Sequence, residues 1–150
     1  MLLGSCGTPA IVCPAPALPS PSPTYVETVD SLVVTPARAH LREASAAESE
    51  SFEALAAQLQ VACGESPPGS ACELTQLRSE LAGLPAPDHP TLFTDIEGSL
   101  DAALTSAHGA FAPPDRDCNG QGEPVCDARA ITGGLVRAAC ELGAGDDGGH

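Results

Sequence analysis

The clearest helical pattern in the chain is FTDIEGSLDAALTSAHGAF, residues 93–111. Its apolar residues recur every three or four positions and so share one face of an α-helix. Thr94 and Glu97 have the spacing of a capping box near the start of this helix. The pattern therefore predicts an amphipathic helix that must bury one face against other elements. That face consists of Phe93, Ile96, Leu100, Ala103, Leu104, Ala107 and Phe111.

A long helix is predicted between Thr35, a capping residue, and Gly64, a helix stop. Pro36 suits its first turn, because the N–H that proline lacks has no helical partner there. Glu48 lies within the apolar face of this helix. Because an unpaired buried charge is costly, the helix must bend there or the carboxylate must find a partner. The apolar face consists of Leu41, Ala44, Phe52, Leu55, Leu59 and Ala62.

Two further helices complete the set. Ser70 and Glu73 form a capping-box pattern before the first of them, which runs to Gly83. Asp127 is the predicted N-cap of the second. The pair Gly133-Gly134 weakens this last helix by roughly 2 kcal/mol relative to two alanines. Its apolar face consists of Ala128, Ile131, Leu135, Ala138 and Leu142.

Four helices with one apolar stripe each bury those stripes against one another, and their connections favour antiparallel neighbours. The predicted fold is all-α, a small disulfide-stabilised four-helix bundle over residues 35–142. An extended Pro-rich tether at residues 1–34 precedes it, with one short extended segment at 25–34, and a disordered acidic tail follows at 143–150. Aromatic residues make up only 3% of the chain, so crosslinks matter to such a core.

Length and charge narrow the functional classes. A chain of 150 residues supports one small domain. Twenty acidic residues stand against six arginines, with no lysine, and give a formal net charge of −14. This charge repels phosphate backbones, which excludes nucleic acid as a partner. The missing lysine excludes P-loop phosphate binding and Schiff-base catalysis, because both need its ammonium group.

The N-terminal segment has no charged residue before Glu27, and six prolines between residues 9 and 23 favour an extended tether. Within it, Leu3-Gly4-Ser5-Cys6 resembles the lipobox of bacterial lipoproteins. The resemblance implies that Cys6 is lipidated and that the chain meets a membrane only through this anchor. Met1-Leu2 is shorter than a signal peptide, so a longer precursor is expected. The tether and its second cysteine, Cys13, are also similar to the outer-membrane spanin lipoproteins of phage lysis.

Cysteine usage indicates an oxidising compartment. With Cys6 set aside as the lipid anchor, the other six of the seven cysteines form an even set. Two pairs flank short loops before predicted helices, and elimination gives a third pair among the fifteen connectivities open to six cysteines. A zinc site is the other interpretation, but no Cys-x-x-Cys pair occurs. The predicted disulfides are Cys63–Cys72, Cys118–Cys126 and Cys13–Cys140.

Residues 115–126, DRDCNGQGEPVC, resemble the calcium loop of EF-hand and dockerin-type repeats. Oxygen-bearing side chains at positions 1, 3 and 5 and glycine at position 6 match that pattern. At position 12 the family uses a bidentate carboxylate, but here Cys126 stands there and Asp127 comes one step late. A disulfide loop without metal is therefore the favoured interpretation, and calcium is the alternative. The implied ligands are Asp115, Asp117, Asn119, Gln121 and Glu123.

The chain contains no catalytic or cofactor-binding motif that its sequence context supports. Glu97, Asp101 and His108 share one flank of the helix at 93–111, but a solvated face explains them better than a metal site. The leading prediction is a non-enzymatic exported or lipid-anchored cell-envelope protein that acts through protein–protein contacts. It would reside in the periplasm, in the outer membrane, at the cell surface or in the medium. The alternatives are a calcium-binding helical module, a spanin-like lysis lipoprotein and a small secreted enzyme whose residues meet only in space.

Overall fold

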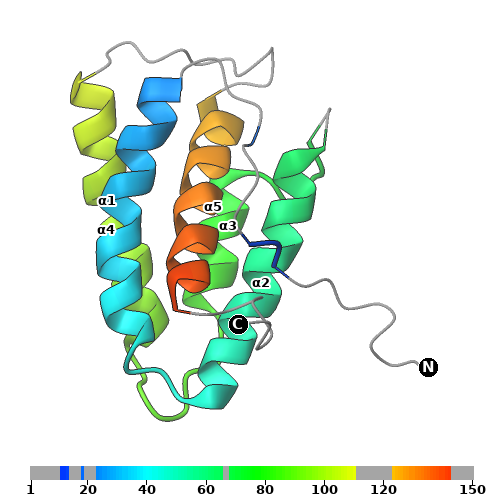
Figure 1. Ribbon diagram of the computed structural model, residues 1–150, viewed down its shortest axis with the longest axis vertical. Helices are drawn as coiled ribbons and strands as arrows, with labels where there is room; N and C mark the ends of the chain where they lie inside the picture. Colours follow the sequence, from blue (N-terminus) through cyan, green and yellow to red (C-terminus); the bar gives the residue numbers. More distant parts are fainter. Residues whose placement is uncertain (1–10, 14–17, 19–22, 66–67, 111–122, 143–150) are drawn as a thin grey trace.

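The computed structural model describes residues 11–13, 18, 23–65, 68–110 and 123–142, and these ranges contain five α-helices and no strand (Figure 1). The predicted all-α bundle with disulfides is confirmed, with five helices rather than four in the part of the chain described. The helices are α1 (Pro23–Leu41), α2 (Ala46–Gly64), α3 (Leu74–Ala82), α4 (Leu92–Ala110) and α5 (Glu123–Glu141).

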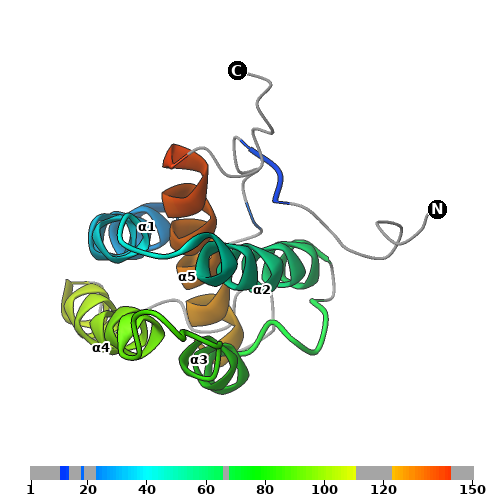
Figure 2. The same ribbon diagram turned by 90° about the horizontal axis from the view of Figure 1, so that it is seen from below.

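Helix α5 occupies the centre of the bundle. It packs against α1, α2 and α3, while α4 packs against α1 and α3. Figure 2 shows α1 and α4 on one side of α5, and α2 and α3 on the other. Because α5 is covered from several sides, most of its side chains between Cys126 and Ala139 are buried. The single apolar face predicted for this helix therefore underestimates its burial.

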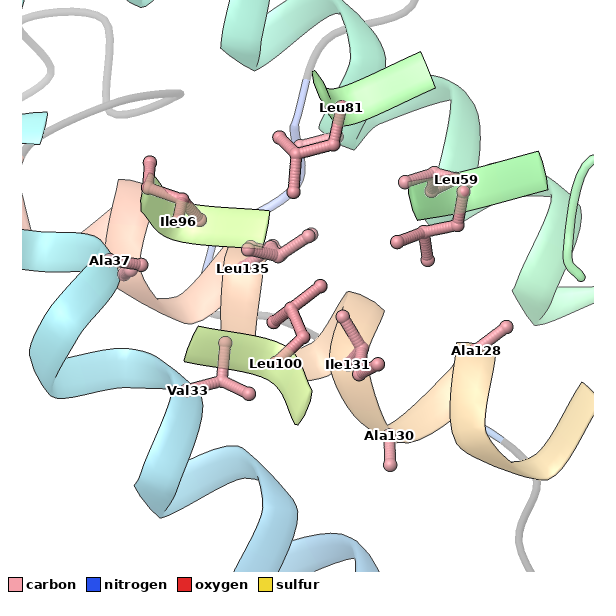
Figure 3. Close-up of a cluster of buried hydrophobic side chains, with 14 of the residues drawn as sticks. Val33, Ala37, Leu59, Leu81, Ile96, Leu100, Ala128, Ala130, Ile131 and Leu135 are labelled. Carbon is pink, nitrogen blue, oxygen red and sulfur yellow. The ribbon is translucent and has the colours of Figure 1, made fainter. Parts of the chain in front are cut away.

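The core consists mainly of small and aliphatic side chains, as the low aromatic content requires. Phe52 and Phe93 are an exception, because their parallel rings stack at 6.3 Å between centroids and join α2 to α4. The apolar face predicted for α4 is confirmed from Phe93 to Ala107, and Phe111 lies outside the described residues. Figure 3 shows side chains from all five helices converging, with Val33, Ala37, Leu59, Leu81, Ile96, Leu100, Ala128, Ala130, Ile131 and Leu135 labelled.

The predicted capping boxes of α3 and α4 are wrong. Glu73 itself is the N-cap of α3, where its carboxylate accepts a hydrogen bond from the backbone N–H of Gln76. In α4 the hydroxyl of Thr94 donates to the carbonyl of Thr91, and Glu97 instead pairs with an arginine of α3. Helix α3 thus starts three residues after the position that its pattern suggested, and α4 starts three residues before. The predicted stop of α3 at Gly83 is confirmed.

Helix α1 contradicts the extended segment predicted at 25–34 and the tether boundary at residue 34. Tyr25, Val29, Val33, Ala37 and Leu41 recur every four residues and are all buried in a helix that packs against α4 and α5. The β-branched residues of this segment favour extended backbone locally, but burial of the stripe outweighs that preference. Pro36 lies inside the helix and not in its first turn. At this position the missing N–H of proline costs the helix one backbone hydrogen bond. The bundle therefore begins at Pro23.

The single helix predicted from Thr35 to Gly64 is in fact interrupted. Ser45 is the N-cap of α2, and its side chain accepts from the backbone N–H of Glu48 at 3.2 Å. The carboxylate of Glu48 accepts from the backbone N–H of Ser45 at 2.9 Å, which completes a capping box. Both outcomes considered for Glu48 occur together, since the helix breaks before it and its carboxylate is partnered.

Helix α5 starts at Glu123, so Asp127 is not its N-cap but a buried residue inside the helix. Further along, Gly134 lies against α1. A Cβ added at Gly134 would lie 2.8 Å from the Cβ of Val33, whereas one added at Gly133 would meet nothing within 4 Å. Glycine at 134 therefore allows the close approach of α1 and α5, and Gly133 has no such role.

Two disulfides join the predicted pairs. Cys63 at the end of α2 bonds Cys72 just before α3, with 5.0 Å between their Cα atoms. Cys13 bonds Cys140 in the last turn of α5, with 5.8 Å between Cα atoms. Cys126 is also disulfide-bonded, while Cys118, its predicted partner, lies outside the described residues.

Candidate functional site

The N-terminal residues Ile11–Cys13, which we call the docked segment, lie against α2 and α5 (Figure 1). Ile11 is only 5% exposed and belongs to the core cluster. The disulfide between Cys13 and Cys140 fixes the segment to the last turn of α5. Part of the predicted Pro-rich tether is therefore attached to the bundle, as the predicted Cys13–Cys140 pair implies.

Gln60 of α2 holds the backbone of the docked segment. Its side-chain oxygen accepts from the N–H of Val12 at 2.9 Å, and its side-chain nitrogen donates to the carbonyl of Val12 at 3.1 Å. The side chain of Val12 itself is 57% exposed. Because both hydrogen bonds go to the main chain, Gln60 binds the backbone at position 12 and makes no hydrogen bond to the side chain there.

Leu18 gives a second point of attachment for the N-terminal part of the chain. It is half-buried and packs against the core, and its Cδ2 would lie 3.8 Å from a Cβ added at Gly64. Gln60 and Gly64 are one turn apart on α2. Both described points therefore lie along the C-terminal part of α2.

A second polar cluster joins three helices. Tyr25 of α1 donates a hydrogen bond to the carboxylate of Asp127 in α5. His108 of α4 places its Nε2 atom 3.2 Å from the Tyr25 hydroxyl and 3.3 Å from the Asp127 carboxylate. The rings of Tyr25 and His108 also stack, with centroids 6.0 Å apart. Asp127 is only 3% exposed, so these donors compensate for the burial of its carboxylate.

In this cluster His108 contacts Tyr25 and Asp127, and not Glu97 and Asp101, with which it shares a flank in the sequence pattern. Glu97 and Asp101 instead form ion pairs with Arg78 of α3, at 2.5 and 2.7 Å. Within the described ranges no group of three histidine, cysteine, aspartate or glutamate side chains is arranged to hold a metal ion. The flank 97–108 therefore serves to attach α3 and α1 to α4.

Glu48 is fully buried, and its pKa is strongly shifted. Burial alone would raise the pKa of this carboxyl. Hydrogen bonds from the backbones of Ser45, Asp88 and His89 and from the His89 ring outweigh it and lower the pKa from 4.5 to about 2. The same contact raises the pKa of His89. Glu48 thus connects the start of α2 to the loop between α3 and α4.

The predicted calcium ligands Asp115, Asp117, Asn119 and Gln121 lie outside the described residues, as does the predicted lipidation site Cys6. Glu123 is the first residue of α5, so the last four positions of the predicted loop are helical. Calcium binding at residues 115–126 stays a prediction.

One cavity among the described residues holds about 310 Å³, at the lower end of the range for small-molecule sites. It lies among the end of α1, the first half of α2 and the end of α5. None of the three histidines considered for a spatial active site, His40, His89 and His108, is among its lining residues. Its lining consists of Leu41, Arg42, Ser49, Phe52, Glu53, Ala139 and Leu142.

Neither Gln60 nor Tyr25 was recognisable as a site residue in the sequence. Gln60 is one of several polar residues on α2, and nothing in the sequence distinguishes it from the others. Tyr25 belongs to the stretch for which the sequence predicts an extended segment. The recurrence of apolar residues every four positions from Tyr25 to Leu41 was the available signal for α1, and the prolines before it and Pro36 within it obscured that signal.

None of the described helices is long and apolar enough to cross a bilayer. Comparison with protein-family models, with curated proteins and with solved structures gives no match to this chain.

Proposed function

We propose that this chain is a non-enzymatic exported protein of the cell envelope, lipid-anchored through Cys6, whose helical bundle acts through contacts with other proteins. The observation that carries the proposal is the Cys13–Cys140 disulfide, which attaches the residues next to the proposed anchor to the end of α5.

Disulfide content supports export. Five of the seven cysteines are disulfide-bonded in the described residues, at Cys13, Cys63, Cys72, Cys126 and Cys140. Structural disulfides persist in the periplasm and outside the cell and are rare where glutathione and thioredoxin keep thiols reduced. The bonds also brace a core of small side chains that has few aromatic rings.

The position of the Cys13–Cys140 bond limits how far the bundle would stand from a membrane. Cys13 is only seven positions after Cys6, and seven residues reach at most about 25 Å when fully extended. The remaining prolines, from Pro14 to Pro23, lie beyond the crosslink and add nothing to this distance. The proposed anchor therefore holds the side of the bundle that carries Cys140 close to the lipid surface.

Charge indicates the kind of partner. Three described arginines are already paired with carboxylates, and Arg129 is buried, where it donates to the carbonyls of Cys63 and Glu65. In the part of the chain that the structure describes, exposed acidic side chains thus outnumber arginines, so a charged partner surface would be basic. The paired arginines are Arg38, Arg78 and Arg137.

The anchor is tested by expressing the protein from its own gene in its own host and measuring its detergent partition and intact mass. We expect the wild type to enter the detergent phase with the added mass of a lipid on Cys6. Cys6→Ser should enter the aqueous phase. Ser5→Ala is the matched control, because it keeps a small residue before the cysteine. A wild-type protein without lipid mass would overturn the anchor.

A further inference from the structure

We propose that the Cys13–Cys140 disulfide is a site of reversible thiol–disulfide exchange with an extracytoplasmic dithiol, and that its reduction releases the docked segment from α2 and α5. The proposal rests on the proposed function for its compartment and for the consequence at the membrane, but not for the chemistry of the bond.

The two described disulfides differ in accessibility. Cys13 and Cys140 are both partly exposed at the outer side of the bundle. Cys63 and Cys72 are 0% and 1% exposed, and the Sγ atom of Cys63 lies 3.5 Å from the hydroxyl of Thr132 in α5. Exchange begins with attack of a thiolate on a disulfide sulfur, so access to that sulfur limits the rate. An external dithiol therefore reaches Cys13–Cys140 first.

Among the described residues, the docked segment has few other attachments. Ile11 contributes one buried side chain, Gln60 contributes two hydrogen bonds to Val12, and the next described contact along the chain is Leu18. Against these stands the conformational entropy of ordering the segment. Such an element, with a mostly exposed side chain at its middle, is at the low-stability end of a fold. Its docking therefore depends on the covalent bond.

The buried disulfide has no equivalent element to release. Its turn is also held by a backbone hydrogen bond from Gly69 to Ala62 at 2.8 Å and by one from Cys72 to Gly69 at 3.0 Å. Helices α2 and α3 extend directly from the two cysteines. Reduction of Cys63–Cys72 would leave this turn in place.

Exchange at Cys13–Cys140 takes two steps. First, one thiolate of the dithiol forms a mixed disulfide with Cys13 or Cys140, and the other cysteine leaves as a thiolate and takes up a proton. The second thiol of the reductant then displaces the first cysteine. Overall, two electrons and two protons pass to the protein, and the dithiol becomes a disulfide.

On an anchored chain, the release would change the distance between bundle and membrane. In the crosslinked chain the first fixed point, Cys13, is seven positions after Cys6. After reduction the next described contact with the bundle is Leu18, twelve positions after Cys6. The maximum reach then rises from about 25 Å to about 43 Å.

The test uses the purified full chain without lipid, titrated with dithiothreitol, alkylated and digested for mass spectrometry. We expect half of Cys13 and Cys140 to be alkylated at a dithiothreitol concentration at least tenfold below that needed for Cys63 and Cys72. Hydrogen exchange at the same point should show lost protection at Val12 with unchanged protection of α5. Labelling of all four cysteines at one concentration, or continued protection of Val12 after reduction, would overturn the proposal.

Gln60→Ala sharpens the test without altering a cysteine. Loss of its two hydrogen bonds weakens docking, so the concentration for half-reduction of Cys13–Cys140 should fall about fivefold. Gln58→Ala is the matched control, because Gln58 is exposed on the same helix and should leave that concentration unchanged. Equal effects of the two variants would show that docking does not govern the bond. Because lipid is absent throughout, failure here leaves the anchor untouched, and failure of the detergent-partition test leaves this result untouched.

Discussion

Helix α5 has one interface with α1 and another with the docked segment, and the two are built from different interactions. Against α1, the contact is close packing: Gly134 meets Val33 with no room for a side chain. Ion pairs of Asp30 with Arg137 and of Arg38 with Glu141 lie along its edge. Against the docked segment, the contact is one disulfide, one buried isoleucine and a glutamine on the neighbouring helix.

The two interfaces of α5 differ in how their contact energy is distributed. Close packing spreads the contact energy over many atoms, so the α1–α5 interface separates only when the bundle unfolds. The docked segment concentrates its attachment in one bond that can be broken chemically while the bundle stays folded. Three measurements test this difference, and a fourth tests a contact that lies outside both interfaces.

Removing the Cys13–Cys140 bond should have the largest effect. The bond closes a loop of 127 residues in the unfolded chain, so Cys13→Ser with Cys140→Ser should lower the free energy of unfolding by about 3–5 kcal/mol, with the lower value expected because the released segment also regains freedom in the folded state. Removal of Cys63–Cys72, with a sequence separation of 9, should cost about 2.5 kcal/mol. Urea unfolding followed by circular dichroism measures both. A larger loss for the buried pair would contradict the entropic explanation.

Gly134→Ala tests the packed interface. The added methyl group would overlap Val33, so we expect a loss of about 2 kcal/mol. Gly133→Ala is the control on the neighbouring residue, where open space and better helix propensity should give a gain of about 1 kcal/mol. The same urea unfolding applies. If Gly134→Ala also stabilises the bundle, the close approach of α1 and α5 is refuted.

Tyr25→Phe tests the polar end of the α1 contacts. It removes the hydroxyl that donates to Asp127 and leaves a buried carboxylate with fewer donors, which should cost about 1.5 kcal/mol. Ser31→Ala, at an exposed position of the same helix, should change stability little. Thermal unfolding of both variants beside the wild type distinguishes them. Equal melting temperatures for Tyr25→Phe and the wild type would show that the Tyr25 hydroxyl does not stabilise the bundle.

The mildest effect concerns pH and belongs to neither interface. Glu48 has a pKa of about 2 in the folded state against an ordinary 4.5, so its contribution is present above pH 4.5 and is lost as pH falls toward 2. The pKa of His89 is raised, so its contribution is complete below pH 6.5 and is lost as pH rises through the folded-state value. Stability should therefore be greatest between pH 4.5 and 6.5.

Melting temperatures across pH check this profile. Glu48→Gln should flatten both limbs, because it removes the lowered pKa and the cause of the raised one. Glu50→Gln, exposed on the same helix, serves as control and should keep the wild-type profile. An unchanged profile in Glu48→Gln would assign the pH response to other groups.

The sequence predicted the fold class, the face of α4 and two of the disulfide pairs. The fold class and the face of α4 follow from local periodicity. The Cys63–Cys72 pair follows from the short separation of the two cysteines, and the Cys13–Cys140 pair follows from elimination. It failed for α1, where β-branched residues and a proline locally disfavour a helix. It also gave no indication that Gln60 would bind the backbone of Val12, because that contact joins residues 48 apart.

By itself, the amino-acid order established the helical class, the acidity and the cysteine inventory, since each of these is a property of composition or of periodicity along one segment. Only the folded molecule shows that residues 25–34 are helical, that α5 is central, and that Gln60 holds the backbone of the docked segment. These outcomes depend on the burial that distant segments provide for one another, and burial is worth more than the local preferences that it overrides.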